Sequence, residues 1–573
     1  MTPEKNFTAK FTNKHPRLPG VMPIWHGAVD EAQFRSLCEQ VKHDGGKLLA
    51  LWGSDEQTRG NGYELHTALV TASGMLCLSL PISATHPAYP DVSDLFPAAS
   101  RMQRAVIDLL GLHPTGADDQ RKWLRHASWP ADLHPLRKSF DANGHINKYN
   151  PDRGSIHAQL PNPRCALPNP PPASEKLLAG HPEEGTNESL RDISINSLHP
   201  TETDAYPFIQ VSGDGVHEIP VGPVHAGTIE PGHFRFSIIG DRVLRLEERL
   251  GYKHKGIEKR FESMNLEQGA KLAGRISGDS TVAYAWAYAQ AVESVTGTTP
   301  SARAQFLRGV FLEIERIHNH LGDLGYLGND VALAFGFAQF WILKEDLLRV
   351  LGELFGHRYM MDIVIPGGVA CDIDANGCER LLQALTHIER GTNKLKDIYD
   401  EHSGTQDRFL TTGRVTPDLA AQLGLTGLPG RASGQAWDLR ADFPCAPYDA
   451  LEVRMSTHRN GDVAARVILR FEEISESIRL IRDILNRLPE GSLVETVADA
   501  PDGKLGIGWV EGWRGEIMVA LHTGKNNSIH RLHPHDPSWQ NWPVLEHAII
   551  GNIVPDFPLI NKSFNLSYSG QDL

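Results

Sequence analysis

The segment Gly274–Glu293, GRISGDSTVAYAWAYAQAVE, carries two serines three positions apart, Ser277 and Ser280, just ahead of a long helical pattern. Two side chains at this spacing beside a helix start can bind one ligand or ion together, as Cys-x-x-Cys pairs bind metals. The simpler interpretation is that the serines cap the helix predicted from about Thr281. Asp279, which stands between them, is an equally suitable cap and a candidate proton carrier.

The composition indicates a globular protein with more than one core. A chain of 573 residues is too long for a single hydrophobic core, which predicts two or three domains. Its 40% hydrophobic and 22% charged residues are ordinary for soluble proteins. The formal charge of -14 disfavours nucleic acid as the main partner. No run of about 18 apolar residues occurs, so no membrane-spanning helix is predicted.

The cysteines do not suggest a disulfide framework. None belongs to a Cys-x-x-Cys pair, and the chain start lacks the apolar segment of a secretory signal. They are therefore expected to be reduced cytosolic thiols. The six are Cys38, Cys77, Cys165, Cys371, Cys378 and Cys445.

The patterns along the chain predict an α+β protein in four parts. Residues 1–19 form an N-terminal tail, and residues 20–145 have the helix and strand patterns of a small α/β domain. Residues 146–205 are rich in Pro, Asn, Ser and Glu, which indicates a linker or an extended arm lying on a partner. Residues 206–573 form a larger, mainly helical domain with small flanking sheets.

Two long amphipathic segments dominate the larger domain. Residues 302–327 and 464–488 each place apolar side chains on one stripe, so two helices packed in a bundle are expected. Short strands are predicted before them, at HFRFSII, and after them, in WVEGWRGEIMVALHTG. The common phosphate-loop, H-E-x-x-H and G-x-S-x-G motifs are absent.

Several motifs together resemble a known family. The larger domain contains the stretches VHEIPVGPVHAGTIEPGHFRF, RLGYKHKGIEKRFE, EIERIHNHLGDLG, IPGGV, GRASGQAWDLR and EGWRGEI. These stretches are similar to the catalytic large subunit of energy-converting nickel–iron hydrogenases. That subunit corresponds to the quinone-reducing 49-kDa subunit of respiratory complex I. The stretch YPDVSDLFPAASRMQRAVIDLLG, followed by HASWPADLHPLRKSF, resembles the complex I 30-kDa subunit. Fused in this order, the two resemble the large subunits of hydrogenase-3 and hydrogenase-4.

The resemblance assigns a meaning to the two serines. In the hydrogenases two cysteine pairs hold nickel and iron; the corresponding positions here are Ser277 and Ser280, and Ser567 and Gly570 near the C-terminus. No cysteine follows Cys445. A serine hydroxyl stays protonated at neutral pH and is a poor ligand for a centre that needs soft thiolates. The chain is therefore expected to hold no metal and not to activate hydrogen by itself.

The same resemblance implies candidate residues in the cavity that the metal would occupy. In the loop GPVHAGTIEPGHFRF, family members carry a proton-relaying Glu or a quinone-binding His where Pro231 stands here. Glu230 and His225 are the neighbours to which that role could pass. The alternative is that both make loop hydrogen bonds at a sheet edge.

Two further candidates come from the family pattern. The quinone-binding tyrosine of complex I falls at Gly278, and Tyr284 is either its substitute or a core residue. Arg514 matches the hydrogenase arginine beside the iron ligands. It is expected to bind an anion, to pair with Asp279 or to lie at a sheet edge.

A histidine tract and a basic stretch receive no catalytic role. HRLHPHDP, with His530, His533 and His535, is interpreted as a solvent-exposed loop rather than a metal site. GYKHKGIEKR is basic and lies on the family surface that faces an iron–sulfur subunit, so its charges are either interface charges or solvated ones.

The resemblance implies a subunit of an oxidoreductase complex that couples electron transfer to proton or ion translocation. The chain itself holds no cofactor; a 4Fe–4S cluster is expected in a partner small subunit, and quinone is a candidate acceptor. The implied partners are that iron–sulfur subunit, a ferredoxin-like subunit and integral membrane ion-translocating subunits. The implied location is peripheral, on the cytoplasmic side of the inner membrane. The alternatives are a non-catalytic scaffold and a quinone reductase with a rearranged site.

Overall fold

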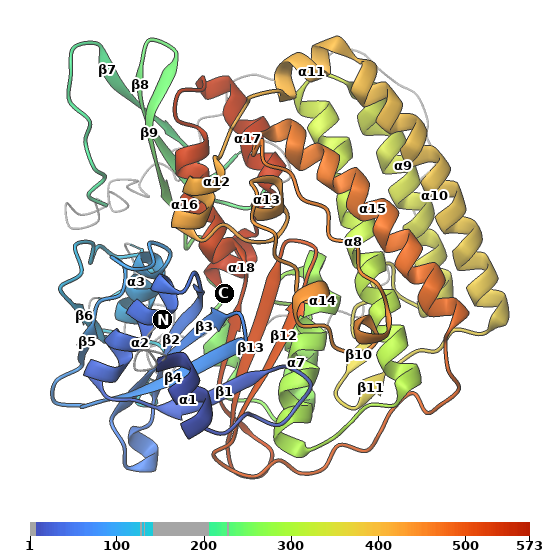
Figure 1. Cartoon of the computed structure of the whole chain (residues 1–573). Coiled ribbons are helices and arrows are strands. Elements are labelled where there is room, and N and C mark those ends of the chain that lie inside the picture. Colours follow the sequence, from blue (N-terminus) through green and yellow to red (C-terminus); the bar gives the residue numbers. More distant parts are fainter. Residues whose placement is uncertain (1–6, 127–128, 131, 141–205, 226–228) are drawn as a thin grey trace, which may run out of the picture.

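The computed structural model combines helices with several small sheets (Figure 1). It describes residues 7–126, 129–130, 132–140, 206–225 and 229–573. Almost all of the predicted linker therefore lies outside the described residues. Within the described ranges, no helix is both long and apolar enough to cross a membrane.

The N-terminal unit is an α/β sheet with the strand order β1-β4-β3-β2. The predicted hairpin is present, with antiparallel β3 and β4, and β1 runs parallel to β4. An Asp30–Gln33 capping box starts the helix α2, as a short polar side chain at this position favours. Part of the expected N-terminal tail is helical (α1). The elements are α1 Phe7–Lys14, β1 Ile24–Ala28, α2 Glu31–His43, β2 Lys47–Asp55, a 3-10 turn Gln57–Arg59, β3 Tyr63–Thr71, β4 Gly74–Ile82, β5 Ala88–Pro90, α3 Ala99–Leu110 and β6 His113–Thr115.

The larger domain is built on a group of long helices (Figure 1). The two helices expected from the apolar stripes are α8 (Ala302–Asp330) and α15 (Val463–Asn486), and they pack against each other. Two more, α9 (Ala334–Phe355) and α10 (Ala375–Glu401), complete the bundle, α9 against α8 and α10 against α9 and α15. The bundle buries the apolar stripes that the sequence shows.

Shorter helices surround this bundle and form the C-terminal region. They are α5 Ile257–Phe261, α6 Leu266–Ala273, α7 Thr281–Thr296, α11 Ser403–Phe409, α12 Pro417–Leu423, α13 Gly427–Ala432, α14 Leu439–Asp442, α16 Ser538–Ala548, α17 Phe557–Phe564 and α18 Tyr568–Asp572, with 3-10 turns at Gly278–Ser280, Tyr448–Ala450 and Val554–Asp556.

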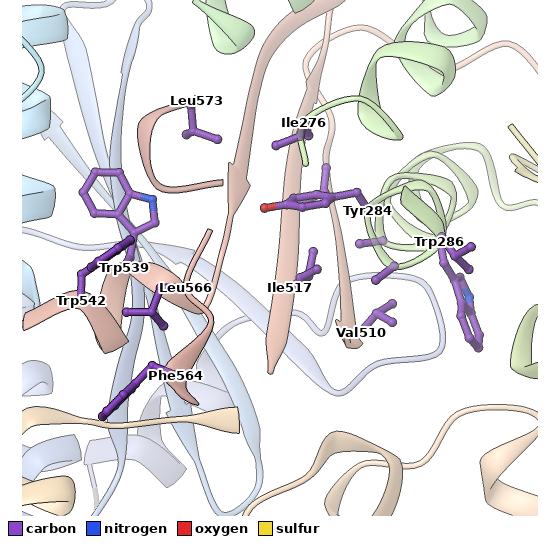
Figure 2. Close-up of a cluster of buried hydrophobic side chains, with 14 of the residues drawn as sticks. Ile276, Tyr284, Trp286, Val510, Ile517, Trp539, Trp542, Phe564, Leu566 and Leu573 are labelled. Carbon is purple, nitrogen blue, oxygen red and sulfur yellow. The ribbon is translucent and has the colours of Figure 1, made fainter. Parts of the chain in front are cut away.

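Two antiparallel sheets and a short ladder accompany the helices. They are β7 Val216–Val221, β8 His233–Ile239 and β9 Arg242–Arg249; β12 Leu505–Glu511, β13 Glu516–Thr523 and β14 Ile529–His535; and β10 Val364–Ile365 with β11 Gly368–Val369. Helix α7 lies directly on β12 and β13. A Cβ atom at Gly508 would lie 1.8 Å from the Ala287 carbonyl oxygen, so only glycine permits this close contact. Figure 2 shows Tyr284, Val510 and Ile517 in the resulting core.

The prediction that the histidine tract is an exposed loop is wrong. His530, His533 and His535 lie in β14, and only 7% of His533 and 1% of His535 are exposed. The His533 ring stacks on Trp52 of β2 with the ring centroids 4.9 Å apart, which joins the two domains. Burial lowers the pKa of His535 to about 3. A neutral histidine can pack as an aromatic side chain, so this histidine-rich segment forms a buried strand although its sequence looks polar.

Candidate functional site

A cavity of about 540 Å³ lies where α8, α9 and the C-terminal residues meet the turn that precedes α7. The turn contributes Ser277, Gly278 and Asp279, and the loop between β12 and β13 contributes Arg514. The residues from Asn565 to Ser569 close another side. Two of the four positions that resemble metal-ligand positions, Ser277 and Ser567, therefore line one space.

Ser277, Ser567 and Gly570 are joined by hydrogen bonds, whereas Ser280 bonds to other residues. Ser277 Oγ lies 3.0 Å from Ser567 Oγ, although 290 residues separate them. Ser567 Oγ also accepts a hydrogen bond from the Gly570 amide at 2.8 Å, which caps α18. Ser280 Oγ accepts hydrogen bonds from Trp513 Nε1 at 3.1 Å and from Arg514 Nη1 at 3.3 Å.

At these four positions the side chains supply three serine hydroxyls and, at Gly570, only a hydrogen atom that cannot bind a metal. Hydroxyl oxygens do not supply the soft thiolate ligands on which nickel–iron chemistry depends. At Gly570 a Cβ atom would lie 2.3 Å from Asp536 Oδ2, so a longer side chain there requires Asp536 to move. The present residues therefore do not fit a nickel–iron group. Elsewhere in the described ranges, no cluster of three or more His, Cys, Asp or Glu side chains is arranged to hold a metal ion.

The prediction that Ser277 and Ser280 cap α7 is wrong. Neither side chain accepts a hydrogen bond from the first amides of the helix. The carboxylate of Glu315 in α8 accepts them instead, from Val282 N at 2.7 Å and Ala283 N at 3.2 Å. A residue of another helix thus satisfies the free amides of the helix start.

Glu315 is the functional candidate that the sequence interpretation missed. Burial raises the pKa of Glu315 to about 8, and the nearby Asp279 carboxylate acts in the same direction. A carboxyl group with such a pKa is suited to exchanging protons near neutral pH. Its signal in the sequence was weak, because EIERIHNHLGDLG contains other acids that form structural ion pairs.

The structure pairs Asp279 with Arg514, one of the alternatives for this arginine. Two bonds join them, Nη2 to Oδ2 at 2.5 Å and Nη1 to Oδ1 at 2.9 Å. Burial alone would raise the pKa of Asp279, but the guanidinium charge, its hydrogen bonds and the Ser277 hydroxyl hold it below the ordinary value. Asp279 is therefore an anion that neutralises Arg514 in the space between the serines.

Glu230 and His225 lie in different surroundings. Glu230 borders the cavity, where its carboxylate accepts hydrogen bonds from Ser569 Oγ at 2.6 Å and from the Ser569 amide at 3.0 Å. His225 is not among the residues that line the cavity, and its Nε2 lies 2.7 Å from the Gly232 carbonyl oxygen. Glu230 therefore reaches the cavity, and His225 holds the loop together.

Tyr284 belongs to the core rather than to the cavity wall. It is fully buried in α7, and its hydroxyl donates a 2.7 Å hydrogen bond to Asp536 Oδ2. In Figure 2 its ring lies beside Ile517, with the hydroxyl directed away from Trp286. Of the two interpretations of this tyrosine, core packing matches these contacts.

The basic stretch makes contacts within the chain. Lys253 pairs with Glu230 at 3.3 Å, and Lys259 pairs with Glu262 at 3.0 Å. Lys255 Nζ donates to the Ile276 carbonyl at 2.7 Å, just before the serine turn. These charges therefore help to place the cavity loops.

Ser277→Ala is expected to lower the free energy of unfolding by about 1 kcal/mol. The hydroxyl donates to Asp279 Oδ1 at 2.7 Å and contacts Ser567, and a methyl group replaces neither bond. The measurement is a urea unfolding curve of the full chain. Ser263→Ala is the matched control, because the exposed hydroxyl of Ser263 bonds, within the described part of the chain, only to the Arg260 carbonyl. An unchanged midpoint in Ser277→Ala would show that the hydroxyl of this serine does not stabilise the fold.

Comparison with known proteins agrees with the family resemblance. The model of the respiratory-chain NADH dehydrogenase 30-kDa subunit matches residues 27–146, and that of the 49-kDa subunit matches residues 330–504. Formate hydrogenlyase subunit 5 of Escherichia coli (strain K12) is 30% identical over 535 residues, which cover 92% of this chain and 85% of that protein. Hydrogenase-4 component G of the same organism is 29% identical over 535 residues, covering 93% and 84%.

A solved structure shares the fold. The archaeal membrane-bound sulfane sulfur reductase contains a chain that aligns with a TM-score of 0.59 at 24% identity, covering 63% of this chain and 99% of that one. The class is therefore that of fused complex I 30-kDa-like and 49-kDa-like subunits. Within it, the chain belongs to the family of formate hydrogenlyase subunit 5 and hydrogenase-4 component G. Other relatives are named as subunits of membrane-bound hydrogenase and of NADH-quinone oxidoreductase.

Proposed function

We propose that this chain is the peripheral-arm subunit of a membrane-bound oxidoreductase complex in which the nickel–iron centre has been lost. The complex couples electron transfer to proton or ion translocation. Its partners are an iron–sulfur small subunit with a 4Fe–4S cluster, a ferredoxin-like subunit and ion-translocating membrane subunits. The chain lies on the cytoplasmic side of the inner membrane and is held there by these partners.

The observation that carries this proposal is that hydroxyls and a glycine stand at the ligand positions. Ser277 and Ser567 line one cavity and bond to each other. Gly570 bonds to Ser567, and Ser280 bonds to Arg514 on the cavity wall. Thiolates at these places would create a soft metal site, and hydroxyls do not. The Arg514–Asp279 ion pair supplies a fixed, neutral pair of charges in the same space. Direct activation of hydrogen at this position therefore has no chemical basis in the residues.

The cavity favours a reductase over a purely structural coupler. A scaffold with a dead site predicts a filled or apolar cavity, whereas this one retains about 540 Å³ and polar side chains. A volume of this size is typical of small-molecule sites. Glu230 borders it and can transfer a proton to a reduced acceptor, with quinone as one candidate. His225 and Tyr284 have no direct part in this proposal, because their side chains bond elsewhere.

The test uses the intact complex purified from membranes. Metal analysis is expected to find far less than one nickel per chain, and hydrogen-dependent dye reduction is expected to be absent. Electron transfer to quinones is then assayed with Glu230→Gln, which is expected to slow turnover by roughly tenfold or more. Glu218→Gln is the control, because this exposed residue of β7 pairs with Arg235 and with no other residue that the structure describes.

Each outcome has a distinct meaning. Stoichiometric nickel, or hydrogen oxidation by the complex, would contradict the loss of the metal centre. Ion translocation by the complex without quinone, at equal rates in Glu230→Gln and Glu218→Gln, would favour the scaffold alternative.

A further inference from the structure

Two lysines on the wall of the cavity have no ion-pair partner among the described residues of that wall. Each of the three acidic side chains on its wall already has a cationic partner: Asp279 with Arg514 at 2.5 Å, Asp323 with Arg470 at 2.9 Å and Glu230 with Lys253 at 3.3 Å. Two further lysines border the same space, Lys344 and Lys562. Among the described residues of the wall, no acid remains to neutralise them.

Lys344 is a buried cation without a salt bridge to any described residue. It enters from α9 with 8% of its surface exposed, and no hydrogen bond joins it to the described part of the chain either. Its ammonium lies 4.9 Å from the centroid of the Trp341 ring. A Cβ atom at Gly322 would lie 2.8 Å from Nζ, so the glycine leaves room for the ammonium. Burial lowers the pKa of Lys344, while Asp323 and Asp279 act to raise it.

Lys562 approaches the same space from α17. Its ammonium lies 4.6 Å from the Tyr326 ring centroid, and its hydrogen bond is to the neutral Asn565 side chain at 3.4 Å. Outside the wall, burial raises the pKa of Asp330 and the charge of Lys562 opposes this shift, but no ion pair within 4.0 Å joins these two described residues. Both lysines therefore place their charge over an aromatic face at the cavity.

An unpaired buried ammonium is costly to keep. Removing a cation from water without a counter-ion is unfavourable even after the protein has relaxed around it. Proteins tolerate this cost where a ligand supplies the missing charge. The buried Lys344 and the half-buried Lys562, beside one cavity and without ion-pair partners, predict an anionic ligand, because a neutral ligand would leave both charges uncompensated.

We propose that this cavity binds a small oxygen-bearing anion, a carboxylate or an inorganic oxyanion, between Lys344 and Lys562. The aromatic faces of Tyr326 and Trp341 orient the two ammonium groups. The acids on the wall do not repel the anion strongly, since each is held by its own cation. This inference names the ligand class of the proposed reductase site and in that respect rests on the proposed function.

Equilibrium dialysis of the intact complex with radiolabelled sulfate and, separately, succinate tests the proposal. Chloride keeps the ionic strength constant, and no electron donor is present. One site per chain is expected for at least one of the two anions. Lys344→Met and Lys562→Met are each expected to weaken its binding by roughly tenfold or more. Lys394→Met is the matched control, because this exposed lysine of α10 does not line the cavity and should bind like the unaltered chain.

A second readout guards against misfolding. Methionine keeps the length of the lysine side chain and removes an unpaired buried charge, so Lys344→Met is expected to unfold at a higher temperature than the unaltered chain when no anion is present. Lys562→Met, which is less buried, tests the same site independently.

The outcomes separate the two proposals. Failure of both anions to bind at one site per chain, or unchanged binding in both variants, would overturn the anion site. Anion binding together with bound nickel would leave this inference standing and refute the proposed loss of the metal. Tighter binding of sulfate would identify the ligand as an inorganic oxyanion, and tighter binding of succinate would identify it as a carboxylate.

Discussion

Arg431→Met is expected to lower the free energy of unfolding by about 3–5 kcal/mol. The guanidinium of Arg431 is 1% exposed and joins two buried carboxylates, Glu473 at 2.7 Å and Glu511 at 3.0 Å. Methionine fills similar space but leaves both carboxylates without this cation. An uncompensated buried charge costs more than the original pair contributed.

The remaining partners do not replace Arg431. His320 Nε2 lies 2.8 Å from Glu473, and burial lowers the pKa of this histidine. Burial and the neighbouring Asp438 raise the pKa of Glu511. Arg316, 3.6 Å from Glu473, is a further guanidinium beside this carboxylate and compensates it only in part. In the variant the pKa of Glu473 is therefore expected to rise, and that of Glu511, which is already raised, to rise further. Their unfavourable effect is then absent below about pH 4 and grows as the pH rises.

The measurement is the urea midpoint of the full chain at pH 7.5 and at pH 5.5, followed by circular dichroism. The loss is expected to be smaller at the lower pH, because the glutamates are then more often neutral. Arg349→Met is the control, since its pair with Glu345 is exposed and should leave the midpoint unchanged. A midpoint shift equivalent to less than about 1 kcal/mol in Arg431→Met would contradict the buried network.

Arg514→Met is expected to cost about 2 kcal/mol at pH 7. This expected loss is below the usual range for buried ion pairs because 39% of the Asp279 side chain is exposed to the cavity, where solvent screens its charge. The arginine also stacks on Trp513 with its guanidinium carbon 3.9 Å from the ring centroid. That contact and the bond to the Asn565 carbonyl at 2.6 Å are lost with it.

The sign of the pH dependence follows from Asp279. In the unaltered chain its lowered pKa gives stability that is present above the unfolded value and is lost as the pH falls through the folded value. Without Arg514, burial raises this pKa, so the ionised carboxylate becomes destabilising above about pH 4. The difference between the two proteins should therefore shrink as the pH is lowered from 7 toward 4.

Thermal unfolding at several pH values measures this difference. The double variant Asp279→Asn, Arg514→Met is the matched control, because it removes the stranded charge and should recover part of the loss. A loss that is independent of pH, with no recovery in the double variant, would mean that packing of the arginine rather than its charge carries the effect.

The sequence predicted the elements whose patterns are local. The apolar stripes of α8 and α15 and the hairpin of β3 and β4 depend on spacing within one segment, so they are visible in the letters alone. The chemistry of the serine positions is also local, since a hydroxyl cannot act as a thiolate wherever the chain places it. What the sequence itself determined is therefore the type and order of the main elements along the chain, and the atoms available at positions 277, 280, 567 and 570.

Only the tertiary structure decided what surrounds those atoms. The burial of His533 depends on Trp52, the capping of α7 depends on Glu315, and the role of Arg514 depends on Asp279. The missing ion-pair partner of Lys344 is of the same kind, because this lysine is unpaired only by comparison with every described acid around it. Burial and pairing are set by contacts between residues far apart in the chain, and a single sequence does not contain those distances.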